Sequence, residues 1–105
     1  MSFRYRRSAQ NPVLTLEWEE QTGDQVWTPL DLTGGTFSLT IYDRSGDLQV
    51  TKTTGITGAD GSVEVQWGAS DLDLASGRYA VYLRETTQSR DYEPLTLEIY
   101  EPGVN

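Results

Sequence analysis

Residues 37–42 read Phe37-Ser38-Leu39-Thr40-Ile41-Tyr42, an alternation of apolar side chains with polar or amphipathic ones. Because successive side chains of a β-strand point to opposite faces, this stretch predicts a strand with one buried and one exposed face. The same alternation recurs at 14–19, 63–67, 79–84 and 95–100. The apolar residues in phase with the predicted buried faces are expected to form the core; they are Leu14, Leu16, Trp18, Phe37, Leu39, Ile41, Val63, Val65, Trp67, Tyr79, Val81, Leu83, Leu95, Leu97 and Ile99.

Turn sequences separate these runs, and two weaker strands are expected at 26–30 and 48–53. Asp43-Arg44-Ser45-Gly46 predicts a tight hairpin turn in which Gly46 adopts a positive φ. The stretch from Ser70 to Ala75 begins with a good N-cap residue and has a carboxylate, Asp73, three positions later. That spacing is close to a capping box and predicts one short helical turn.

About seven short strands with regular turns are typical of two packed antiparallel sheets. The sequence therefore predicts an all-β fold, an antiparallel Ig-like β-sandwich with one short helical turn. A chain of 105 residues is long enough for one compact domain. We expect residues 11–105 to form this single β-sandwich domain and residues 1–10 to form a basic N-terminal arm.

The composition argues against catalysis. The chain contains no cysteine and no histidine, which excludes disulfides and thiolate metal sites and removes the commonest general base. The sequence also has no glycine-rich phosphate loop and no Gly-x-Ser-x-Gly elbow. We therefore expect a protein that is not an enzyme, with no catalytic residue, cofactor or bound metal.

The charge of the chain is unevenly distributed. The formal net charge is −8, although three arginines lie within the first seven residues, so the rest of the chain is more acidic still. An acidic surface repels nucleic acid, because binding there depends on neutralising phosphates with Lys and Arg. No apolar run approaches the roughly 20 residues that span a bilayer, and no secretory signal is present at the N-terminus. We expect no nucleic-acid or membrane partner, and synthesis in the cytoplasm.

The predicted N-terminal arm precedes the first alternating run and combines aromatic residues with arginines, the residue types enriched at interface hot spots. Its candidate partner-binding residues are Phe3, Arg4, Tyr5, Arg6 and Arg7. We expect the arm to leave the sandwich and dock on a partner, so that deleting residues 2–8 leaves folding nearly intact. Docking onto the acidic body of its own domain and a frayed, solvated terminus are the alternatives.

Three tyrosines, Tyr42, Tyr82 and Tyr100, are out of phase with the core residues of their own strands. They are expected on outer sheet faces with Trp27 nearby, where exposed aromatics bind protein partners or stack on sugars. The alternative is that each tyrosine is isolated and partly covered by loops. Trp18 and Trp67 are in phase with the core and are expected to pack there.

Two groups of carboxylates raise other possibilities. Asp60, Asp71 and Asp73 suggest calcium, although the spacing does not match an EF-hand loop and capping of a short turn explains Asp73 without a metal. Glu17, Glu19 and Glu20 suggest the paired acids of a glycoside hydrolase. Because Glu17 and Glu19 would share one solvated face of a strand, a charged outer face is the expected interpretation.

The stretch from Asp31 to Ile99 resembles a β-sandwich of tailed-phage virion proteins, found as the N-terminal domain of baseplate upper proteins and in tail fibres. The resemblance rests on the order of the following features, which are Asp31-Leu32-Thr33-Gly34 before a strand, Phe37-Ser38-Leu39-Thr40-Ile41, Asp60-Gly61 before Val63 and Val65, the acidic turn at 70–74, Ala75-Ser76-Gly77-Arg78-Tyr79, and Leu95-Thr96-Leu97-Glu98-Ile99.

The resemblance implies a non-enzymatic structural component of a tailed-phage virion, made in the host cytoplasm. It would be a small protein-binding β-sandwich that attaches to tail, baseplate or fibre proteins, with homo-oligomeric copies in the particle. A capsid decoration protein on the phage head and a carbohydrate-binding module are the alternatives. A coplanar platform of exposed aromatics beside polar hydrogen-bonding residues would favour sugar binding, whereas a contact area above about 1,000 Å² with neighbouring copies or other virion proteins would favour the structural role.

Overall fold

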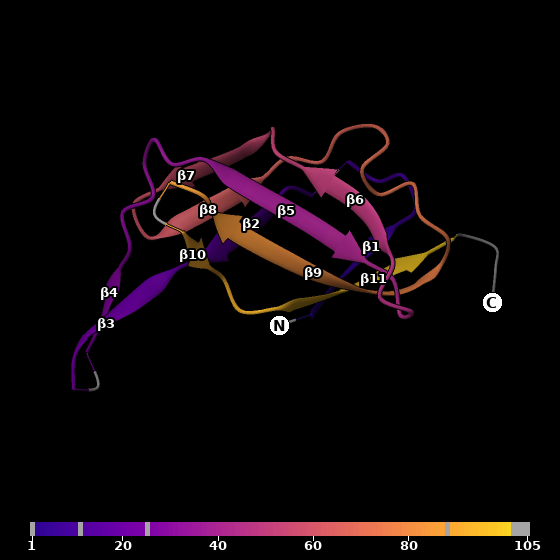
Figure 1. The fold of residues 1–105 in the computed structure, drawn as a ribbon. Helices are drawn as coiled ribbons and strands as arrows, with labels where there is room; N and C mark the ends of the chain where they lie inside the picture. Colours follow the sequence, from indigo (N-terminus) through magenta and orange to yellow (C-terminus); the bar gives the residue numbers. More distant parts are fainter. Residues whose placement is uncertain (1, 11, 25, 88, 102–105) are drawn as a thin grey trace.

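The computed structural model describes residues 2–10, 12–24, 26–87 and 89–101, with the backbone but not the side chains of residues 20–22. Within these ranges the chain forms eleven strands and no helix (Figure 1). In chain order the strands are β1 (Ser2–Arg6), β2 (Leu14–Glu17), β3 (Glu19–Gly23), β4 (Val26–Pro29), β5 (Phe37–Tyr42), β6 (Leu48–Lys52), β7 (Ile56–Ala59), β8 (Ser62–Val65), β9 (Gly77–Glu85), β10 (Arg90–Asp91) and β11 (Leu95–Tyr100).

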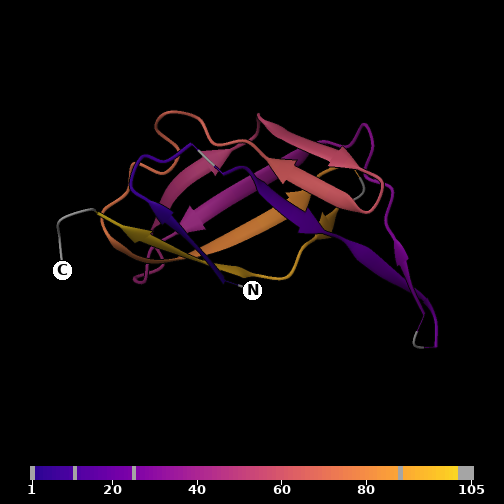
Figure 2. The ribbon, with the colours of Figure 1, turned by 180° about the vertical axis from the view of Figure 1, so that it is seen from behind.

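The strands form two stacked sheets and one separate hairpin. The larger sheet has the order β1-β11-β9-β5-β6, with the short β10 also paired to β9, and the smaller sheet has the order β2-β8-β7. Strands β3 and β4 pair with each other and with neither sheet. Figures 1 and 2, which view the molecule from opposite sides, show the smaller sheet stacked on the larger one and the hairpin projecting from one end. The all-β, sandwich-like fold is therefore as predicted.

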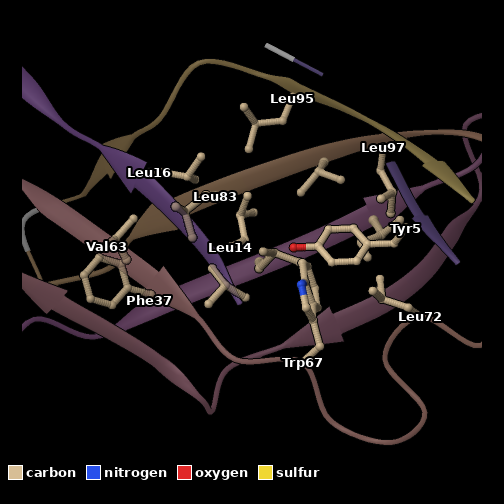
Figure 3. Close-up of a cluster of buried hydrophobic side chains, with 14 of the residues drawn as sticks. Tyr5, Leu14, Leu16, Phe37, Val63, Trp67, Leu72, Leu83, Leu95 and Leu97 are labelled. Atoms are coloured by element: carbon tan, nitrogen blue, oxygen red, sulfur yellow. The ribbon is translucent and has the colours of Figure 1, made fainter. Parts of the chain in front are cut away.

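The core lies between the two sheets (Figure 3). Every residue that the alternation placed in phase with a buried face is buried, and the residues that alternate with them along these strands are exposed or half-buried. Four buried leucines outside the strands, Leu30, Leu32, Leu72 and Leu74, complete the core from the loops.

The five strands that alternation predicted are present as β2, β5, β8, β9 and β11, and the two weaker strands expected at 26–30 and 48–53 are present as β4 and β6. Strands β1, β3, β7 and β10 were not predicted, because β10 has only two residues and the sequences of β3 and β7 contain at most one large apolar side chain each. The predicted turn at Asp43 is confirmed, since Gly46 has a φ of 85° and its N–H donates to the carbonyl of Asp43 at 3.0 Å.

The prediction of a purely antiparallel fold is wrong, because β1 runs parallel to β11 and the larger sheet is mixed. The prediction that residues 1–10 form an arm leaving the sandwich is also wrong, since β1 is an edge strand of that sheet. Phe3 and Tyr5 face the core and alternate with exposed arginines, a period-2 pattern too short to stand out in the sequence.

Tyr5 is a core residue with 4% of its surface exposed. Its ring packs edge to face against Trp67, with 5.7 Å between the ring centroids, and its hydroxyl donates to the carbonyl of Pro12 at 2.8 Å. Figure 3 shows the two side chains next to each other at one side of the core. The N-terminal strand is therefore an edge strand of the larger sheet that contributes a side chain to the core.

Turns replace the helical turn predicted from Ser70 to Ala75. The N–H of Asp73 donates to the carbonyl of Ser70 at 3.3 Å, but the carboxylate of Asp73 accepts from Arg7 and Ser8 instead of capping a helix. In this conformation the segment places Leu72 and Leu74 in the core, where both leucines are buried.

A nearly buried ion pair attaches this segment to the sheet edge. Lys52, on the edge strand β6, is 8% exposed, and its Nζ lies 2.7 Å from Oδ2 of Asp71. The same oxygen accepts the N–H of Gly68 at 2.7 Å. Burial alone would raise the pKa of Asp71, but the hydrogen bonds from Lys52 and Gly68, together with the charge of Lys52, outweigh it, so the pKa of Asp71 lies below its usual value.

The buried and exposed tyrosines allow a matched test of the N-terminal strand. We expect Tyr5→Ala to lower the free energy of unfolding by about 3–5 kcal/mol, the usual cost of removing a buried aromatic side chain. Tyr82→Ala, at a side chain that is 45% exposed and contacts Tyr42 edge to face, should lower it by only about 1 kcal/mol. Urea denaturation measures both variants, and equal effects would contradict the placement of β1 in the fold.

The Lys52–Asp71 pair predicts a specific loss of stability in acid. Because the pKa of Asp71 is lower in the folded than in the unfolded chain, its ionised form stabilises the fold above the unfolded pKa of about 4, and this contribution is lost as the pH falls through the folded pKa. Asp71→Asn should therefore flatten the fall in unfolding free energy below about pH 4. Asp47→Asn, at an exposed carboxylate, is the control, and an unchanged acid profile in Asp71→Asn would exclude the proposed contribution.

Candidate functional site

The projecting hairpin of β3 and β4 presents large apolar side chains to solvent. Val26 is 52% exposed and Trp27 is 60% exposed, the highest exposed fraction among the large hydrophobic residues described. Trp27 lies opposite Gln21 in the hairpin register. Neither strand is supported by a neighbouring sheet (Figure 2), so these side chains do not contribute to the core.

Three backbone hydrogen bonds lie at the base of the hairpin; one closes the hairpin, and the other two attach it to Gly61 in the body. The N–H of Trp18 donates to the carbonyl of Gly61 at 2.9 Å, the N–H of Leu30 to Trp18 at 3.0 Å, and the N–H of Gly61 to Leu30 at 2.8 Å. Gly61 has a φ of 81°, and a Cβ at this position would lie 2.7 Å from Cβ of Pro29. The glycine is therefore required for the hairpin to leave the body at this angle.

A groove of about 530 Å³ lies where the hairpin joins the body. We call it the hairpin groove; it is lined by Glu17, Trp18, Glu19, Trp27, Asp91, Tyr92 and Glu93. The rings of Trp18 and Tyr92 meet edge to face with 5.1 Å between their centroids, and the Tyr92 hydroxyl donates to the carbonyl of Glu17 at 2.8 Å. These contacts hold Trp18 and Tyr92 in place.

The hairpin groove is negatively charged. Asp91 forms an ion pair with Arg84 at 2.8 Å, whereas Glu17, Glu19 and Glu93 have no ion-pair partner within the described part of the chain. Burial raises the pKa of Tyr92, and the nearby carboxylates of Glu93 and Glu17 raise it further. The hairpin groove thus combines aromatic surface with several carboxylates whose charge is not neutralised locally.

Glu17 and Glu19 are exposed, as expected for a charged outer face, but they belong to two strands instead of one. Strand β2 ends at Glu17 and β3 begins at Glu19, with the buried Trp18 between them. Both glutamates are exposed and line the hairpin groove. The side chain of Glu20 lies outside the described part of the structure.

Two of the three predicted tyrosines form an aromatic patch on the outer face of the larger sheet. The rings of Tyr42 on β5 and Tyr82 on β9 meet edge to face at 5.6 Å with an interplanar angle of 79°. Leu48, on the neighbouring strand β6, pairs with Tyr42 and is exposed. We call these three residues the outer-face patch. Trp27, which was expected near the tyrosines, lines the hairpin groove instead.

Tyr100 does not join the outer-face patch. Ala80 on β9 pairs with Tyr42 on one neighbouring strand and with Thr96 of β11 on the other, so Thr96 is the residue of β11 level with Tyr42. Tyr100 lies four residues further along β11. The guanidinium carbon of Arg4 lies 4.3 Å from the centroid of the Tyr100 ring, and Arg4 also pairs with Glu98 at 3.2 Å. The residue is therefore partly covered by its own chain.

The residues predicted to bind a partner through the N-terminus are dispersed by the fold. Tyr5 is buried and Phe3 is half-buried against the core, so neither is free for a partner in this structure. Arg7 pairs with Asp73 and Glu101. Arg6 is exposed and has no ion pair among the described residues. The structure thus matches the alternative in which the N-terminal segment docks on its own domain.

Two of the three carboxylates considered for calcium already have partners in the chain. Asp71 accepts hydrogen bonds from Lys52 and Gly68, and Asp73 accepts them from Arg7 and Ser8. In the described ranges, three or more acidic side chains nowhere gather into an arrangement that could hold a metal ion. The described residues also contain no helix long and apolar enough to cross a membrane.

Comparison of the chain with protein-family models, with characterised proteins and with solved structures gave no match. The hairpin groove and the outer-face patch are therefore assessed from their own chemistry.

Proposed function

We propose that this protein is a non-enzymatic, protein-binding β-sandwich that serves as a structural component of a tailed-phage virion, attached to tail, baseplate or fibre proteins. The observation that carries the binding role is the hairpin of β3 and β4, which holds Val26 and Trp27 in solvent. Contact with another protein would bury both side chains.

The exposure of this hairpin supports a binding role on energetic grounds. An isolated two-stranded hairpin is at best marginally stable in water, and this one has no adjacent strand. Large aromatic side chains gain the most from burial and are enriched at protein interfaces. Folding of the body requires neither exposed side chain, so their retention in solvent is better explained by binding than by stability.

The aromatic geometry favours protein over sugar as the ligand. Each aromatic pair in the described part of the chain meets edge to face, with interplanar angles of 72–85°. A platform for a flat sugar ring would need exposed rings in a common plane. A carbohydrate-binding module remains the second candidate, because Trp27 stands beside carboxylates that accept hydrogen bonds from hydroxyl groups.

The virion assignment is supported by the order of elements from Asp31 to Ile99 that resembles phage baseplate and tail-fibre domains. Its first feature forms a turn directly ahead of β5, where Asp31 accepts the N–H of Thr33 at 3.1 Å and the N–H of Gly35 donates to Leu32 at 3.1 Å. An Ig-like arrangement of the strands, homo-oligomeric copies in the particle and synthesis in the host cytoplasm belong to the same proposal. Decoration of the phage head is its alternative location.

The absence of catalysis is also proposed. Its support is the lack of histidine and cysteine in the sequence and the solvent exposure of Glu17 and Glu19, since a catalytic acid usually needs a raised pKa from a less solvated setting.

Mass spectrometry of purified phage particles from the culture that carries the gene tests the proposal. We expect the chain in the particles in a fixed ratio to known structural proteins, and in the tail fraction after heads and tails are separated. Recovery with the heads would support the decoration alternative. A chain that is expressed in the infected cell but absent from washed particles would contradict the virion assignment.

A further inference from the structure

We propose that the hairpin groove is the docking site for a cationic segment of a partner protein, with an arginine or lysine side chain of that segment lying against Trp27. This inference rests on the proposed protein-binding function and specifies the chemistry of the partner.

Trp27 supplies the first half of the recognition. Indole is the best of the aromatic rings for attracting a cation to its face, and an arginine can also stack its planar guanidinium on the ring. At 60% exposure the side chain is accessible to a ligand without any rearrangement of the core. The aliphatic stem of a long cationic side chain would cover the adjacent apolar surface.

Carboxylates supply the second half of the recognition of the cationic side chain. Glu17 and Glu19 flank Trp18 in one stretch of the chain, and Glu93 belongs to a distant segment that meets this stretch at the hairpin groove. None of the three has an ion-pair partner within the described residues. Their charge complements a guanidinium or ammonium group and opposes an acidic peptide or a phosphate.

Part of the hairpin groove is ordered in the unbound chain. The edge-to-face contact of Trp18 with Tyr92 positions these two rings, and the backbone bonds among Trp18, Leu30 and Gly61 close the base of the hairpin. A ligand has to order the outer part of the hairpin with Trp27 but not these groups, which limits the free-energy cost of association.

Charge also favours a different protein over a second copy of this chain. With a formal net charge of −8, two copies repel each other at long range. Arg4, Arg7 and Arg84 are engaged by carboxylates of their own chain, whereas Arg6, Arg44 and Arg78 are exposed and have no ion pair among the described residues. The long-range repulsion is therefore the argument against a second copy, and a different protein that contributes a basic segment does not meet it.

The experiment uses the full chain and a short capped peptide of alternating glycine and arginine, carrying a fluorescent label, with the matched peptide in which neutral citrulline replaces arginine. Binding is measured by fluorescence anisotropy at low and high salt. We expect the arginine peptide to bind more tightly than the citrulline peptide, and its affinity to fall at high salt, because salt screens the carboxylates.

Substitutions locate the binding. Trp27→Ala and Trp27→Leu should each lower the affinity for the arginine peptide by about fivefold, since each removes a cation–π contact. Because Leu retains apolar bulk, the second variant separates loss of this contact from loss of apolar surface. Glu19→Gln combined with Glu93→Gln should lower this affinity by a similar factor. Asp47→Asn combined with Glu64→Gln removes the same charge from residues outside the hairpin groove and should leave affinity nearly unchanged. All positions are at the surface or half-buried, and circular dichroism verifies that each variant is folded.

Several outcomes would overturn the inference. Equal binding of the citrulline peptide would remove the role of the cation, and equal weakening by the two double variants would indicate attraction to overall charge. Self-association that Trp27→Ala abolishes would identify a second copy as the occupant, and binding of neutral oligosaccharides that requires Trp27 would identify a sugar. If particles contain the chain but these peptide results fail, only the cationic docking site is wrong. If the chain is absent from particles, the virion assignment fails whatever the peptide does.

Discussion

Exclusion of water from between the two sheets is the constraint on which the rest of the structure depends. Leu39 pairs with Leu83, and Ile41 with Val81, in neighbouring strands of the larger sheet, and these four side chains are almost completely buried beneath the smaller sheet. Because side chains alternate between faces, a slip of one residue in any strand would exchange its buried and exposed sets. The register that buries Ile41 also places Tyr42 beside Tyr82 on the opposite face. The outer surface is therefore set by the requirements of the core.

The edge of the larger sheet and a turn outside both sheets also contribute to the core. The edge strand β1 brings Tyr5 against Trp67, and the turn held by the Lys52–Asp71 pair brings in Leu72. The hairpin of β3 and β4 is different, because it contributes no strand to either sheet and exposes Trp27. A segment that is positioned by the body without serving the core is available for binding, and this distinction underlies the proposed function.

The alternation of apolar residues in the sequence predicted the core because burial in a strand repeats every second residue, and long runs such as 79–84 show that period clearly. The same reasoning failed for Tyr5, where the alternation is short and surrounded by arginines, and for Ser70 to Ala75, where inward placement of Leu72 and Leu74 prevailed over local capping preferences. The hairpin groove could not be predicted, because Glu17, Trp27 and Glu93 are far apart in sequence and meet only through the tertiary fold. Its sequence signal was limited to two adjacent apolar residues, Val26 and Trp27, after the turn at Gly23 and Asp24.

The central claim is that this small β-sandwich functions by burying its projecting hairpin against another protein. Amide hydrogen exchange, compared between the free chain and the chain assembled with its partner, tests it directly. The account predicts that amides of β3 and β4 exchange rapidly in the free chain and become strongly protected on assembly, while the central strands β5 and β9 are protected in both states. Unchanged exchange in β3 and β4 on assembly, with new protection confined to other surfaces, would contradict it.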